Sequence, residues 1–422
     1  MVKIAILGYG VVGSGIMQVL DWNRERIALK AGCEIGVKRV LDIRDFPGDP
    51  VEKILTRDVD EILSDPEIKI VAEVIGGVEP AHTFVKKALL AGKHVCTSNK
   101  ELVVNHGAEL LSIARDRELN FLFEASVGGG IPIVRPMNLA LTTDEIVGVA
   151  GILNGTSNYI LTQMEDSGRT FGDALAEAQS LGYAEKNPEA DVEGYDACRK
   201  LAILLSLATG RQVNYKEIHT EGITSLDAAD FAFAREFGYH IKLLVDGRVF
   251  AERVEAVTAP MLVSKSHPLA NVADVFNGVL VQAKVTDDVM FFGRGAGKLP
   301  TAGAVVSDIV DIAKHLGRHI MHVWTSERMP VADAESCVKR RMARLEYNDL
   351  QRAADMIRVV FGASEYTELP GYPGQLAFIA PCEAERDFNR KYAGLSTSPA
   401  VAKTFPALRV YEPISLRNEE FK

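Results

Sequence analysis

Several signatures are missing from this 422-residue chain, and each absence excludes a class of protein. The five cysteines form no C-x-x-C pair, so neither a disulfide framework nor a cysteine-based zinc site is expected. The longest apolar run, Leu201 to Ala208, is far too short to span a bilayer. Basic residues are not in excess, and a net charge of -10 argues against nucleic acid or an anionic membrane as partner.

The composition that is present is typical of a globular protein. A hydrophobic content of 47% with 25% charged residues describes a water-soluble protein, and the length implies two or three domains. The N-terminus enters an apolar strand directly, so we expect no signal peptide. Scattered cysteines fit a reducing compartment, and the expected location is the cytoplasm.

The N-terminal segment carries a glycine pattern suited to a dinucleotide. Val2 to Leu7 is predicted to be a buried strand, and the run Val11 to Leu20 a helix. Between them, Gly8 opens the turn, Gly10 leaves room for a pyrophosphate, and Gly13 lets the helix pack close to the strand. The pyrophosphate would meet backbone N–H groups at the helix N-terminus. The sequence therefore predicts a Rossmann turn, the alternative being a glycine-rich structural loop.

Strands and helices alternate through the rest of this segment. Strands are expected at Ile35–Ile43, Ile68–Val74, His94–Thr97 and Asn120–Glu124, and helices at Pro80–Ala91 and Glu101–Arg117. This rhythm predicts an α/β fold with a parallel sheet that binds its ligand at the carboxyl ends of the strands. We assign residues 1–130 to a Rossmann nucleotide-binding domain, completed by about residues 298–320.

The regular alternation of strands and helices ends after Pro132. Residues 131–297 are predicted to form an α+β substrate and dimerisation domain. Its expected strands are Ile146–Leu153, Val249–Val257, Gly278–Val285 and Val289–Phe292, and its helices Asn154–Met164, Phe171–Leu181 and Val192–Ala208. A linker is expected at residues 325–335. Residues 335–422 then read as a small C-terminal module with the order βαββαβ.

Seven segments in a fixed order give the chain a family resemblance. They are Gly8–Gly15, Thr97–Glu101, Glu124–Pro132, Asn154–Tyr159, Leu181–Glu185, Asp191–Lys200 and Gly293–Gly297. On these motifs residues 1–320 resemble homoserine dehydrogenase. The resemblance implies NAD(P)-linked, reversible reduction of L-aspartate 4-semialdehyde to L-homoserine in threonine, methionine and isoleucine biosynthesis. It also implies a homodimer or homotetramer acting on a small molecule.

Two lysines and an aspartate are the candidate catalytic residues. Asp196 and Lys200 are four apart in a predicted helix and so share a face. The resemblance makes Lys200 the proton donor to the carbonyl, Asp196 its partner, and Lys100 a second active-site lysine near nicotinamide and substrate. The alternatives are a surface salt bridge for the first pair and an ordinary helix-start lysine for Lys100.

The substrate pocket is also assigned by resemblance. Glu185 is expected to bind the substrate ammonium, a role suited to a buried carboxylate. The expected pocket-wall or helix-cap residues are Asn154, Gly155, Thr156, Tyr183 and Asp191. An N-cap of the following helix is an equally good interpretation of Asp191.

Cofactor choice depends on the end of the second predicted strand, which holds both an acid and a guanidinium. Asp42 would favour NAD through the ribose hydroxyl, whereas Arg44 would hold the 2′-phosphate of NADP. We expect NADP, with NAD as the alternative. The expected cofactor-binding residues are Gly8, Gly10, Val11, Val12, Gly13, Arg44, Gly76, Ser98, Lys100 and Gly297.

The Gly128–Gly130 loop resembles the family's monovalent-cation loop. Its expected sodium ligands are Glu124, Val127, Gly129 and Ile131, the alternative being a glycine-rich hinge without an ion. Residues 335–422 resemble an ACT-type regulatory module. However, Glu346–Leu350 replaces the usual Asp-x-Pro-Gly stretch, so threonine inhibition stays open.

Two other functions compete with this interpretation. A non-catalytic NAD(P)-binding amino-acid sensor would not need the two lysines. A cysteine-dependent semialdehyde dehydrogenase would use Cys96 as nucleophile, although a small buried hydrophobe fits that position better. The nine histidines show no metal-binding motif, but His315, His319 and His322 could share one helix side.

Overall fold

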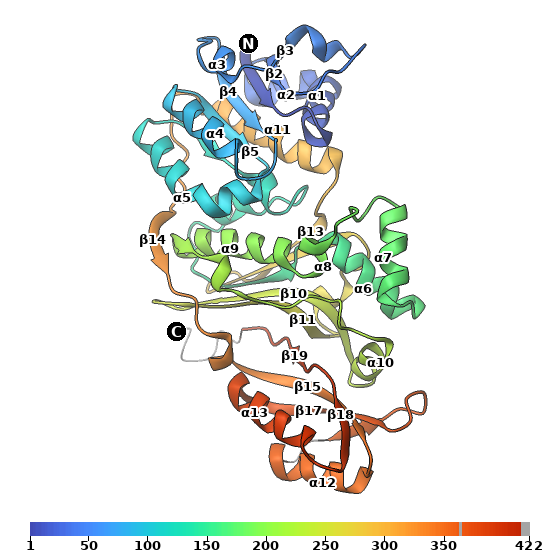
Figure 1. Cartoon of the computed structure of the whole chain (residues 1–422). Helices are drawn as coiled ribbons and strands as arrows, with labels where there is room; N and C mark the ends of the chain where they lie inside the picture. Colours follow the sequence, from blue (N-terminus) through green and yellow to red (C-terminus); the bar gives the residue numbers. More distant parts are fainter. Residues whose placement is uncertain (363–364, 415–422) are drawn as a thin grey trace. The chain divides into compact units, whose positions relative to one another are not determined.

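The computed structural model describes residues 1–362 and 365–414 (Figure 1). Backbone contacts divide the chain into two compact units. Unit 1 comprises residues 1–145, 202–215 and 291–329, and unit 2 comprises the other described residues. This division into two units does not test the three predicted domains, whose boundaries remain predictions.

Unit 1 is built on a six-stranded parallel sheet with the order β3-β2-β1-β4-β5-β6. The strands are β1 (Val2–Leu7), β2 (Ile35–Leu41), β3 (Leu55–Thr56), β4 (Ile68–Glu73), β5 (His94–Thr97) and β6 (Phe121–Leu122). This is the strand order of the dinucleotide-binding Rossmann sheet, so the predicted fold class is confirmed. The carboxyl ends of β1, β2, β4 and β5 form the edge at which a ligand is expected.

Helices of unit 1 come from both ends of its sequence. They are α1 (Val11–Trp22), α2 (Arg24–Ala31), α3 (Val59–Leu63), α4 (Ala81–Leu90), α5 (Lys100–Asp116) and α11 (Lys298–Lys314). α11 packs so closely on α1 that a Cβ on Gly15 would lie 2.9 Å from the Cβ of Ala302. Apolar side chains of α11 therefore share one core with β1 and α1.

A two-stranded sheet of β8 (Arg211–Val213) and β14 (Thr325–Met329) also belongs to unit 1. The predicted linker thus begins as a paired strand. Because α11 ends at Lys314, the prediction that His315, His319 and His322 share a helix side is wrong.

Unit 2 contains an eleven-stranded sheet whose main path is β13-β12-β7-β10-β11-β19-β15-β17-β16. These strands are β7 (Ile146–Ile152), β10 (Tyr239–Val249), β11 (Val254–Ser264), β12 (Phe276–Ala283), β13 (Asp287–Arg294, continuing into unit 1), β15 (Val338–Tyr347), β16 (Tyr366–Glu368), β17 (Gln375–Ala384) and β19 (Leu408–Val410). β9 (His219–Thr220) pairs with β11, and β18 (Val401–Thr404) pairs with β15. Strand β19 lies between β11 and β15, so the C-terminal strands continue the middle sheet.

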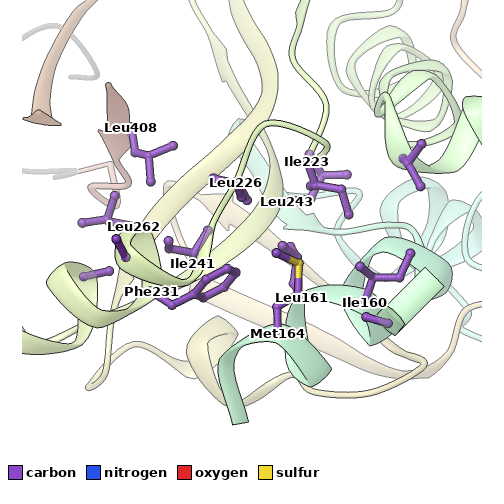
Figure 2. Packing of buried hydrophobic residues seen from close by; sticks show 14 of the residues in the cluster. Ile160, Leu161, Met164, Ile223, Leu226, Phe231, Ile241, Leu243, Leu262 and Leu408 are labelled. Carbon is purple, nitrogen blue, oxygen red and sulfur yellow. The ribbon is translucent and has the colours of Figure 1, made fainter. Parts of the chain in front are cut away.

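Helices cover this sheet and close its core. They are α6 (Gly155–Ser167), α7 (Phe171–Ser180), α8 (Glu189–Val192), α9 (Tyr195–Thr209, continuing into unit 1), α10 (Ala228–Glu236), α12 (Leu350–Phe361) and α13 (Glu385–Ser396). Figure 2 shows Leu161 and Met164 of α6 beside Phe231 of α10 and Ile241 of β10. Leu408 of β19 belongs to the same buried cluster.

Three predicted elements of unit 2 differ from the structure. The strand predicted at Val249–Val257 is wrong, because a turn interrupts it where the Phe250 N–H donates to the Arg253 carbonyl at 2.9 Å. The predicted helix Val192–Ala208 is split into α8 and α9 at Gly194, whose φ is +79°. The C-terminal segment has one strand more than the predicted order βαββαβ, because β18 precedes the last strand β19. None of the helices formed by residues 1–362 and 365–414 is long and apolar enough to cross a membrane.

Candidate active site

The glycine turn after β1 has the geometry that the sequence predicts. Gly8 has a φ of +101°, and its N–H donates to the Leu41 carbonyl at 2.8 Å. A Cβ on Gly13 would lie 2.0 Å from the Gly8 carbonyl oxygen, so α1 can approach β1 only without one. A Cβ on Gly10 would first meet the Arg44 guanidinium, at 3.8 Å. The N-terminus of α1, with Val11 and Val12, is thus open to an anion.

Arg44 and Asp42 form a fork at the end of β2. Arg44 donates from Nε to Asp42 Oδ1 at 3.0 Å and from a terminal nitrogen to Oδ2 at 2.8 Å. The Tyr9 N–H donates to the same carboxylate at 2.7 Å. The hydrogen bonds from Arg44 hold the pKa of Asp42 well below its ordinary value. Both Asp42 oxygens are engaged within the chain, whereas the Arg44 side chain is 57% exposed.

A buried glutamate that sequence reasoning missed organises the loops after β4 and β5. The carboxylate of Glu73 accepts the Ile75 N–H at 2.7 Å and the Thr97 hydroxyl at 2.5 Å, and burial raises its pKa. Asn99 then donates to the Gly77 carbonyl at 2.6 Å and caps α5 by accepting the Leu102 N–H. The available signal was an acid ending an otherwise apolar strand.

These bonds fix three predicted cofactor residues. Gly76, with a φ of +89°, lies in the loop after β4, and the Ser98 N–H donates to the Glu73 carbonyl at 3.3 Å. Lys100 is the first residue of α5. Gly297, with a φ of +122°, is the N-cap of α11 in the same unit. Gly76 and Ser98 therefore lie in loops that follow β4 and β5, and Lys100 and Gly297 lie at helix N-termini.

The predicted sodium loop is held by its own glutamate. The Glu124 carboxylate accepts N–H bonds from Ile133, Val134 and Arg135 at 2.6, 2.8 and 2.8 Å. These three N–H donors occupy most of the hydrogen-bonding capacity of the Glu124 carboxylate. An ion here would therefore be bound by backbone carbonyls of Glu124 and of residues such as Val127 and Ile131. Gly129, with a φ of +56°, leaves no room for a Cβ, which would lie 2.2 Å from the Gly295 carbonyl oxygen.

In unit 2 the predicted catalytic pair lies within a buried polar cluster. Lys200 Nζ donates to Asp196 Oδ2 at 2.7 Å and to the Leu153 carbonyl at 2.8 Å. Asn154, the N-cap of α6, donates to Asp196 at 3.0 Å and to Asp191 Oδ1 at 2.7 Å. Lys200 is 9% exposed and Asp196 4%, so this is no surface salt bridge.

The other substrate candidates surround the start of α6. The Thr156 hydroxyl donates to the Tyr183 carbonyl at 2.7 Å, and a Cβ on Gly155 would lie 2.8 Å from the Val275 carbonyl oxygen. Asp191 lies within α8 and is not the N-cap of the next helix. Glu185 is exposed, whereas its predicted role called for a buried carboxylate.

Each half of the predicted site is therefore built within its own unit: Lys100 and the glycine turn in unit 1, and the Lys200 cluster in unit 2. Cys96 is fully buried in β5, and burial raises the pKa of its thiol well above the ordinary value. A buried, protonated thiol is a poor nucleophile, which argues against the cysteine-dependent alternative.

Comparison with known proteins places both segments of the chain in one protein family. The family model for homoserine dehydrogenase matches residues 132–310, and the model for the homoserine dehydrogenase NAD binding domain matches residues 8–124. A homoserine dehydrogenase of Pseudomonas aeruginosa is 43% identical over 397 residues, which cover 92% of this chain and 86% of that protein. The chain belongs to the homoserine dehydrogenase family. It is therefore an oxidoreductase, and the resemblance found in the sequence is confirmed.

Solved structures of the family extend the likeness to the fold. The homoserine dehydrogenase of Thiobacillus denitrificans has a TM-score of 0.88 at 35% identity, covering 97% of this chain and 98% of its own. A hyperthermophilic archaeal homoserine dehydrogenase in complex with NADPH has a TM-score of 0.62 at 26% identity, covering 74% of this chain and 97% of its own.

Proposed function

We propose that this homoserine dehydrogenase catalyses the reversible, NADP-linked reduction of L-aspartate 4-semialdehyde to L-homoserine, on the route to threonine, methionine and isoleucine. The observation that carries the proposal is the buried Lys200 ammonium, which is held by Asp196 and the Leu153 carbonyl. These two acceptors use two of its three N–H bonds. The third is directed at the substrate carbonyl oxygen.

A nicotinamide cofactor held by the glycine turn after β1 and by Arg44 would supply the hydride to the carbonyl carbon, or accept it from the alcohol carbon in the reverse direction. Lys200 donates a proton to the oxygen as it becomes an alkoxide, and in the reverse direction it takes that proton back. Asp196 keeps the ammonium oriented, and Asn154 orients Asp196 through its amide at 3.0 Å. Lys100 is the second lysine of the site, Glu185 binds the substrate ammonium, and Asp191 belongs to the substrate pocket. Gly155, Thr156 and Tyr183 form the pocket wall.

The residues of unit 1 fit a dinucleotide. Gly10 leaves the space that a pyrophosphate needs, and the N–H groups at the start of α1 face it. The exposed Arg44 guanidinium supports NADP over NAD, because Asp42 is already bound by Arg44 and the Tyr9 N–H. The NADPH complex of the archaeal relative is in keeping with this preference.

Three further assignments belong to the same proposal. A structural sodium ion is held by backbone carbonyls of Glu124, Val127, Gly129 and Ile131. The enzyme works in the cytoplasm, and it does so as a homodimer or homotetramer. The sodium assignment rests on the family resemblance and the glycine-rich loop. The location rests on the scattered cysteines, and the oligomeric state on the family resemblance.

The proposed function is tested by following NADPH oxidation by the purified chain with L-aspartate 4-semialdehyde. The wild type should oxidise NADPH, and Lys200→Ala should lower kcat by roughly 10²–10⁴-fold, the usual contribution of a general acid. NADPH affinity should be unchanged, because Lys200 lies in unit 2. The exposed Lys186 of the same unit provides the control Lys186→Ala, which should behave as wild type.

Two outcomes would contradict the proposal. Normal turnover by folded Lys200→Ala would remove Lys200 as the proton donor. Tight NADPH binding by the wild type without oxidation would favour the amino-acid sensor.

A further inference from the structure

Two histidines and a glutamate meet between α4 and α5, two neighbouring helices of unit 1 (Figure 1). His82 lies in the first turn of α4, while His106 and Glu109 lie in α5. One potential ligand atom from each residue lies within 4.8 Å of the other two. None of the three takes part in the reaction proposed above.

A nitrogen of each imidazole lies near the same carboxylate oxygen. His82 Nε2 lies 3.0 Å from Glu109 Oε2, and His106 Nδ1 lies 3.4 Å from the same oxygen. The rings are stacked, with centroids 3.8 Å apart and planes 14° from parallel. Both nitrogens thus lie close to one carboxylate oxygen. The lone pairs of stacked rings are nearly parallel, so binding one metal ion through both nitrogens requires the rings to tilt from this arrangement.

A second carboxylate orients His82. Its Nδ1 lies 3.3 Å from Glu79 Oε1, and the other Glu79 oxygen accepts the Thr83 hydroxyl at 2.8 Å. Histidines that bind metals commonly donate their second ring N–H to a carboxylate, which fixes the tautomer and the ring orientation. Glu79 therefore leaves Nε2 of His82 as the ligand atom.

One ammonium already competes for the carboxylate of this cluster. The Lys86 ammonium lies 2.6 Å from Glu109 Oε1. Because the Lys86 side chain is 43% exposed, it can turn into solvent when another cation binds the glutamate.

We propose that His82, His106 and Glu109 bind a divalent ion of the zinc class and so join α4 to α5. Two imidazoles and one carboxylate are ligands that Zn²⁺ accepts, with water completing the tetrahedron. α5 begins at Lys100, and α4 follows the loop that contains Gly76. The ion therefore braces the two helices next to predicted cofactor loops.

The test is a titration of the untagged chain with zinc chloride by calorimetry, and with Co²⁺ followed by visible absorption. The wild type should bind one ion per chain, and the melting temperature should rise with zinc. His82→Ala and His106→Ala should weaken binding beyond tenfold, and Glu79→Gln should weaken it by about tenfold, as for other carboxylates that orient a ligand histidine. Glu109→Gln should also weaken it.

Two controls separate this site from adventitious binding. Lys86→Ala should bind zinc more tightly, because the ammonium that competes for Glu109 is gone. His315→Ala removes a partly exposed histidine elsewhere in unit 1 and should leave affinity unchanged. Wild-type affinity in both His82→Ala and His106→Ala, or weaker binding in Lys86→Ala, would overturn the proposal.

Discussion

Replacing Arg44 with alanine should separate the two nicotinamide cofactors. The guanidinium has five N–H bonds, and Asp42 accepts two of its hydrogen bonds. The other three are available to a 2′-phosphate. Loss of one or two charge-assisted hydrogen bonds should weaken NADPH binding roughly tenfold to hundredfold.

NADH should respond differently because Asp42 stays in place. Asp42 is 8% exposed and keeps the Tyr9 N–H at 2.7 Å, so its carboxylate remains fixed at the end of β2. Once freed from Arg44, it can accept a ribose hydroxyl. NADH affinity should then be unchanged or improved.

The assay is a fluorescence titration of each variant with NADPH and with NADH, alongside its melting temperature. Arg115→Ala is the control, because Arg115 is also 57% exposed but lies in the last turn of α5. It should bind both cofactors as the wild type does. Equal weakening of NADPH and NADH by Arg44→Ala would refute the phosphate role.

Three further predictions concern the glycine turn, the catalytic pair and a buried acid. Gly13→Ala should abolish tight NADPH binding and lower the melting temperature, because its Cβ would lie 2.0 Å from the Gly8 carbonyl oxygen; Gly303→Ala, which has open space in α11, is the control in the same titration. Asp196→Asn should lower kcat at least about tenfold with unchanged NADPH affinity, since the ammonium loses its charged partner; unchanged kcat would contradict this. Burial raises the pKa of Asp308 to about 8, against the opposing pull of Arg135 and with Glu124 and Asp311 nearby. The folded state then keeps a proton that the unfolded state loses near its ordinary 3.8, so stability falls as pH rises between these values. Urea midpoints at about pH 5 and about pH 8 should differ less in Asp308→Asn than in wild type, and equal differences would count against the raised pKa.

The sequence predicted the elements whose signals are local. β1, β4 and β5 are short apolar runs, each followed by a helix, and the structure has them within a residue or two of the predicted bounds. β10 was missed because it carries Lys242 and Asp246 among its buried residues. Their partners, the Val272 carbonyl at 2.9 Å and Lys339 at 2.6 Å, are distant in the chain. No local pattern can reveal that such charges are satisfied.

The same distinction holds for the site. The Asp196–Lys200 contact follows from a spacing of four within a helix, and the cap at Asn154 from its position at the start of the predicted helix Asn154–Met164. The hydrogen bonds from the Asn154 side-chain amide to Asp191 and Asp196 link the start of α6 to α8 and α9. The spacing of residues in the sequence cannot show such contacts. His82 and His106 face each other from different helices, and so form no sequence motif.

Buried charges also explain why composition is a poor guide to the C-terminal segment. Arg344 of β15 donates to Asp230 at 3.0 Å and to Asp227 at 2.7 Å, both from α10 and its cap. Lys339 of the same strand pairs with Asp246 of β10 at 2.6 Å. Breaking one buried ion pair typically costs roughly 3–5 kcal/mol, because the remaining charge stays desolvated. The buried acids Asp230 of α10 and Asp246 of β10 thus take their cationic partners from residues after 335. This segment therefore contributes buried charge to unit 2, although its sequence alone reads as a separate module.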